Sequence, residues 1–166
     1  MGNPIVFQSL EEAEEALKGR NPSIFCFPFS RTLNKFEETS LLGNIENFLS
    51  RWEAHGHALQ AYAILLHQQI LMVLVDEAFS ATTGCSKDKL FRTVETWARE
   101  NSVSLAPRHL IPIFEADKLH WIPAAQCRHI SPESRIINLS VSDWLSFLKD
   151  YHQPILETSL SVLHKN

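Results

Sequence analysis

Residues 70–75 (Ile-Leu-Met-Val-Leu-Val) form an unbroken apolar run, and this run constrains the fold more than any other feature. A strand with one wet face alternates apolar and polar side chains, whereas a strand without alternation is buried on both faces. A second apolar segment, residues 58–66, precedes it across the short connection His67-Gln68-Gln69, which predicts a β-hairpin. We therefore expect a sheet that is covered on both faces.

The elements around this hairpin follow a recognisable order. A strand is predicted at 24–29, and a helix begins after the capping residue Asn34 and runs past Trp52. Another helix follows the loop at 79–84, and a strand is predicted at 110–115. The order strand, helix, strand, strand, helix, strand is that of a ferredoxin-like (split βαβ) sheet.

Further elements flank this core. Ser9 opens a short N-terminal helix, and a strand at 135–139 and a helix capped by Ser142 lie in the C-terminal segment. The predicted fold class is α+β, with a ferredoxin-like central sheet, an added N-terminal helix and a C-terminal strand/helix segment. We expect one domain over 1–166, with its core at about 23–116 and an extension at about 117–166.

A bare ferredoxin-like sheet leaves one face open to water, which conflicts with the apolar run at 70–75. Either the C-terminal extension or a partner subunit in a homodimer should cover that face.

Composition excludes several classes of protein. The net charge is -4 and the basic residues are scattered, so we expect no binding to nucleic acid or to an anionic membrane. The apolar run is far too short to cross a bilayer, and the acidic N-terminal region is unlike a signal peptide. The three cysteines are widely spaced without a CxxC pair, which is typical of a reducing, cytoplasmic location.

Polar residues gather at one end of the predicted hairpin. With its turn near Gln68, residues whose numbers sum to about 136 lie opposite each other, so Gln60 should face Asp76 and His57 should face Phe79. The end of the preceding helix, which we expect Gly56 to close, and the start of the following one should lie nearby. The candidate site therefore contains Trp52, His55, His57, Asp76, Glu77, Thr82, Thr83, Gly84, Cys85 and Ser86.

The leading hypothesis is a non-catalytic binding or assembly module that takes a small anion at the turn formed by residues 82–86. Helix N-termini present free N–H groups to phosphate or carboxylate. Thr82, Thr83, Gly84 and Ser86 would supply N–H and hydroxyl donors, and His55 or His57 would complement the charge.

The alternative is a small thiol enzyme. Cys85 precedes a helix, whose dipole favours the thiolate, and His55 or His57 would act as the base. A packed, inert cysteine explains the same pattern. His55 and His57 with Asp76 or Glu77 and Cys85 offer metal-ligand types, but the His-x-His spacing is short and weakly specific, and histidines bonding carbonyls at a helix end explain it equally. We predict no metal and no cofactor. Asp76 and Glu77 are adjacent on a strand, so only one of them can face a given pocket.

Residues 45–100 resemble a small uncharacterised protein family. The resemblance rests on Trp52-Glu53-Ala54-His55-Gly56, on Val75-Asp76-Glu77 and on Ala81-Thr82-Thr83-Gly84-Cys85-Ser86, against the family pattern W-x-A-H-G, V-D-E and A-S/T-G-C-S. Asp88 also matches, whereas Lys87 replaces an apolar residue and Thr83 is an insertion. The resemblance implies a shared site.

Members of that family often carry the automatic label "ABC transporter ATPase", which the present sequence does not support. ATP binding by such a domain requires G-x-x-x-x-G-K-[ST], because backbone N–H groups and a lysine hold the phosphates. The five glycines stand at positions 2, 19, 43, 56 and 84, and none precedes a lysine. We therefore reject ATP hydrolysis.

Overall fold

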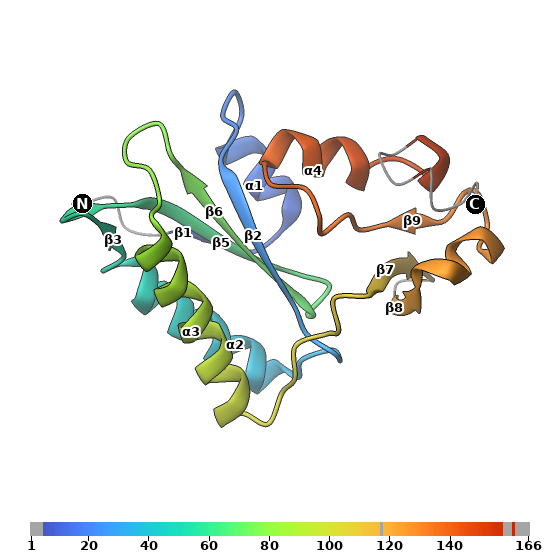
Figure 1. Ribbon diagram of the computed structural model, residues 1–166, viewed down its shortest axis with the longest axis horizontal. Coiled ribbons are helices and arrows are strands. Elements are labelled where there is room, and N and C mark those ends of the chain that lie inside the picture. The colour runs from blue at the N-terminus through green and yellow to red at the C-terminus, as the bar shows by residue number, and fades with distance from the viewer. Residues whose placement is uncertain (1–4, 117, 158–160, 162–166) are drawn as a thin grey trace. The chain divides into compact units, whose positions relative to one another are not determined.

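The computed structural model describes residues 5–116, 118–157 and 161, and it divides into two compact units, residues 1–105 and 106–166 (Figure 1). The strand at 110–115 therefore belongs to the second unit rather than to the sheet of the first.

The first unit is built on a four-stranded sheet in the order β1-β5-β6-β2. β1 is parallel to β5, while β6 is antiparallel to both β5 and β2. Helices α2 and α3 cover one face, and α1 lies on the opposite face (Figure 1). The elements are β1 (Ile5–Phe7), α1 (Leu10–Ala16), β2 (Ser23–Pro28), α2 (Lys35–Leu49), β3 (Glu53–Ala54), β4 (His57–Ala58), β5 (Gln60–Leu66), β6 (Ile70–Asp76) and α3 (Gly84–Glu100).

The predicted hairpin is confirmed by the pairing of β5 with β6, in which Gln60 lies opposite Asp76. All six side chains from Ile70 to Val75 are fully buried, as the absence of alternation predicted. Leu71, Val73 and Val75 belong to the core shared with α2 and α3, and the alternate residues face the other way. A single chain thus buries both faces of β6, so the sheet does not require a partner subunit to cover it.

The ferredoxin-like arrangement is not confirmed. It requires β2 to run parallel to β6 and requires the strand at 110–115 to join the same sheet. Instead, β2 is antiparallel to β6, and that strand pairs within a separate three-stranded sheet. A short strand that was not predicted from the sequence, β1, pairs in parallel with β5. The broader class, α+β, is what the structure has.

Local capping signals predicted the first residues of α1 and α2 correctly, but not the end of α2. Ser9 caps α1, and Asn34 forms a reciprocal capping box with Glu37 at the start of α2. However, α2 ends at Leu49, earlier than predicted, and Gly56 does not close it. His55 (φ 51°) and Gly56 (φ 77°) form the two-residue turn between β3 and β4, which requires positive φ at both positions.

The second unit contains β7 (Leu110–Glu115), β8 (Lys118–Pro123), the 3₁₀ helix η1 (Ala124–His129), β9 (Arg135–Ile136), α4 (Trp144–Tyr151) and the 3₁₀ helix η2 (Ile155–Glu157). Its sheet has the order β8-β7-β9. Asp143, one residue after the predicted cap, caps α4, in which Trp144 and Phe147 stack and are buried. None of the helices in the described ranges has both the length and the apolar character that crossing a membrane requires.

Candidate functional site

Trp52 connects the segment after α2 to the first turn of α3. Its indole Nε1 donates a hydrogen bond to the carbonyl oxygen of Ser86 at 2.9 Å, and the residue is only 2% exposed. The ring of Phe48 lies 5.4 Å from the Trp52 ring, centroid to centroid. Of the predicted site residues, Trp52 is therefore the one that fixes the position of the α3 N-terminus.

Thr83 and Ser86 form a reciprocal capping box at that N-terminus. The Ser86 N–H donates to Thr83 Oγ1 at 3.1 Å, and the Thr83 N–H donates to Ser86 Oγ at 2.8 Å. The Ser86 hydroxyl itself donates to the Thr83 carbonyl oxygen at 3.0 Å. The Thr83 and Ser86 N–H groups and the Ser86 hydroxyl are thus already used within the turn.

Both hydrogen-bond donors of Thr82, the backbone N–H and the hydroxyl, bond to Glu77. Its carboxylate accepts from the Thr82 N–H at 2.9 Å, from the Thr82 hydroxyl and from the Ser23 hydroxyl at 2.8 Å. Burial acts to raise the pKa of Glu77, but the hydrogen bonds from Thr82 and Ser23 and the charge of Lys87 outweigh it and lower that pKa. A protein carboxylate therefore occupies the loop before α3.

Asp76 makes different contacts, in agreement with the expectation that two adjacent strand residues face different surroundings. It accepts a hydrogen bond from the Ala78 N–H at 3.1 Å, and it lies 3.7 Å from the guanidinium of Arg20. The same guanidinium donates to the Tyr62 hydroxyl at 2.9 Å. Asp76 thus belongs to a polar cluster separate from the α3 N-terminus.

Gly84 and Cys85 are the first two residues of α3 and are both exposed. Their N–H groups have no hydrogen-bond partner among the residues that the structure describes, as is usual for the first turn of a helix. Of the three free cysteines, Cys85 alone is exposed. Burial raises the pKa of Cys26 to about 12 and also raises that of Cys127, so both of these thiols stay protonated at neutral pH.

His55 and His57 lie in the β3–β4 hairpin and are exposed. Strand β3 contacts α3, yet no hydrogen bond or ion pair within the described part of the chain joins either imidazole to Cys85. His57 does not lie opposite Phe79, because it pairs with Ala54 instead. The described residues also contain no group of three or more His, Cys, Asp or Glu side chains placed to hold a metal ion.

The structure therefore brings together Trp52, Glu77, Thr82, Thr83 and Ser86 through hydrogen bonds, and places Gly84 and Cys85 at their exposed end. Two contributors were missed from sequence, Ser23 and Lys87. Ser23 becomes a neighbour only because β2 pairs with β6, opposite Val75. No local sequence signal predicts that pairing.

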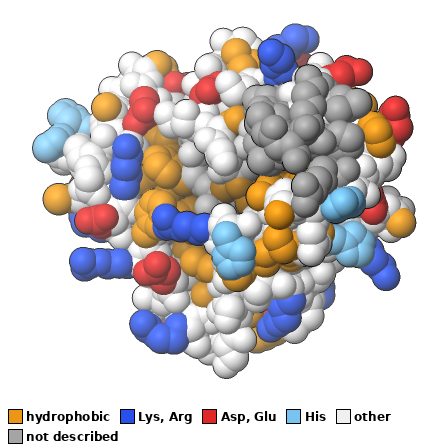
Figure 2. All heavy atoms as spheres, turned by 45° about the vertical axis from the view of Figure 1, so that its right-hand side comes forward, with side chains coloured by type: hydrophobic (Ala, Val, Ile, Leu, Met, Phe, Trp, Pro, Cys, Tyr) orange, Lys and Arg blue, Asp and Glu red, His pale blue; other side chains and the backbone are white. Residues whose placement is uncertain are grey.

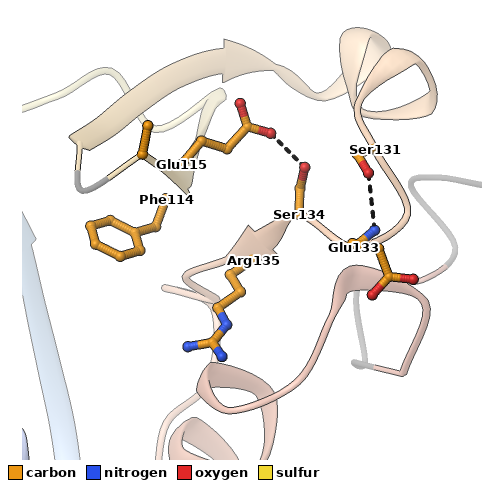
Figure 3. A pocket seen from close by; sticks show the side chains of 7 residues that line it. Phe114, Glu115, Ser131, Glu133, Ser134 and Arg135 are labelled. Atoms are coloured by element: carbon orange, nitrogen blue, oxygen red, sulfur yellow. Dashed lines mark hydrogen bonds between the residues drawn. The ribbon is translucent and has the colours of Figure 1, made fainter.

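The second unit contains a hollow. It is an open cavity of about 440 Å³ between the end of β7 and the start of β9 (Figure 3). Ser134 Oγ donates to the Glu115 carboxylate at 2.5 Å, while the side chain of Arg135 points away from that pair. The cavity is lined by Phe114, Glu115, Ala116, Ser131, Glu133, Ser134 and Arg135. This mixture of charges does not specify one class of ligand.

On the face shown in Figure 2, Lys and Arg side chains are dispersed among acidic and neutral ones and form no continuous basic patch. Comparison of the chain with protein-family models, with curated proteins and with solved structures gives no match. The resemblance in residues 45–100 therefore stays a sequence-based prediction, and the function must be argued from the geometry.

Proposed function

We propose that the protein is a non-catalytic binding module that takes a small anion at the N-terminus of α3. The observation that supports this is the pair of exposed, unpartnered N–H groups of Gly84 and Cys85 at the start of a helix. Peptide N–H groups in the first turn, together with the helix dipole, favour a phosphate or carboxylate. The thiol of Cys85 lies beside them as a further weak donor.

Fewer hydrogen-bond donors are available to an anion than the sequence suggested. Thr82 donates hydrogen bonds to Glu77, and Thr83 and Ser86 bond to each other, so their donors are not free for a ligand. The negative charge of Glu77 also opposes a second anion nearby. We therefore expect weak, millimolar binding of inorganic phosphate, centred on Gly84 and Cys85.

Gly84 offers a matched pair of variants. Proline is favoured at the first helical position, and the extended Thr83 (φ -114°, ψ 165°) suits the residue before it. Gly84→Pro thus removes one free N–H while keeping the helix. Gly84→Ala keeps that N–H, and its added Cβ has no heavy atom within 4 Å.

The test is a titration of ¹⁵N-labelled protein with inorganic phosphate, followed by amide chemical shifts. We expect saturable shifts at Gly84 and Cys85 in the wild type, unchanged affinity in Gly84→Ala and a loss of binding in Gly84→Pro. Glu77→Gln should bind more tightly because it removes the opposing charge. Equal affinity of the proline and alanine variants would refute the proposal.

The second candidate is a thiol enzyme with Cys85 as nucleophile and His55 or His57 as base, and its support is the exposure of Cys85 at the helix N-terminus. We expect Cys85 to react with iodoacetamide at neutral pH faster than a reference thiol peptide. His55→Asn or His57→Asn should slow that reaction. A rate equal to that of the reference peptide, unaffected by either histidine, rules this candidate out.

Two wider expectations also remain proposals. A cytoplasmic location is supported by the three free cysteines. A homodimer was inferred from the need to cover the second face of β6, but that face is already buried in one chain. Any self-association must therefore use another surface.

A further inference from the structure

We draw no further inference here: the strongest candidate, the outward edge of β2, is already paired at one end with residues 104–105 of the same chain, through the bridge between Phe29 and Leu105 and the hydrogen bond from the Ser30 N–H to the Ser104 carbonyl oxygen, and nothing in the structure shows what covers the rest of it.

Discussion

Replacing Trp52 by phenylalanine should destabilise the first unit and loosen the start of α3. The change removes the 2.9 Å hydrogen bond to the Ser86 carbonyl oxygen, which is worth roughly 0.5–1.5 kcal/mol. It also leaves a void where the six-membered ring of a 2% exposed indole was packed, at a further cost of about 1–2 kcal/mol. The free energy of unfolding should therefore fall by about 2–3 kcal/mol.

Urea unfolding followed by far-ultraviolet circular dichroism measures this change without relying on tryptophan fluorescence. With a slope of about 2 kcal/mol/M, the midpoint should fall by about 1–1.5 M. The control is Phe79→Ala, which truncates a ring that is 74% exposed in the loop before α3 and should change stability by less than about 0.5 kcal/mol. If Trp52→Phe behaves like this control, Trp52 does not fix the α3 N-terminus.

Three further changes probe the supports of the first unit. The hydrogen bonds from Arg31 and from the Asn34 N–H lower the pKa of Glu37 from 4.5 to about 2. The charged carboxylate therefore stabilises the folded protein above pH 4.5, and this contribution is lost as pH falls toward 2. The urea midpoints of the wild type and of Glu37→Gln should converge over that interval, and a constant difference between them would contradict the linkage. Gln69→Ala removes a 3% exposed amide that donates to the Phe29 carbonyl oxygen at 3.0 Å, and should cost about 1–3 kcal/mol in urea unfolding, whereas no change would show that this amide is not a support. Gly56→Ala places a side chain at φ 77° and should lower the melting temperature by about 2–4 °C in calorimetry, and an unchanged value would argue against a strained turn.

Helix starts and the β5–β6 hairpin could be predicted because their causes are local. Asn34 and Glu37 cap each other within one turn, and residues separated by a tight turn are forced into one register, such as Gln60 with Asp76. The end of α2 was misjudged because Trp52 continues the helical spacing of apolar residues. Trp52 instead lies beyond the helix end, where its indole N–H donates to the carbonyl oxygen of Ser86, thirty-four residues later in the chain.

The structure brings predicted site residues into contact only where strand, loop and helix follow one another directly in the chain. Glu77 and Thr82 are five residues apart and meet in the loop before α3, as expected from their proximity in sequence. His57 was assigned to an extension of the β5–β6 hairpin. It lies in a separate two-stranded hairpin, because His55 and Gly56 adopt positive φ and turn the chain earlier.

By itself, the sequence determined that β6 is buried on both faces, where the helices begin and that a short polar turn precedes α3, since each follows from side chains within a few residues of one another. The neighbour of β2, the parallel pairing of β1 with β5 and the separate sheet of β7 were decided only in the tertiary structure. Strand partners far apart in the chain are selected by how the whole apolar surface can be buried. A period-two pattern shows which face of a strand is covered, but carries no information on which strand lies beside it.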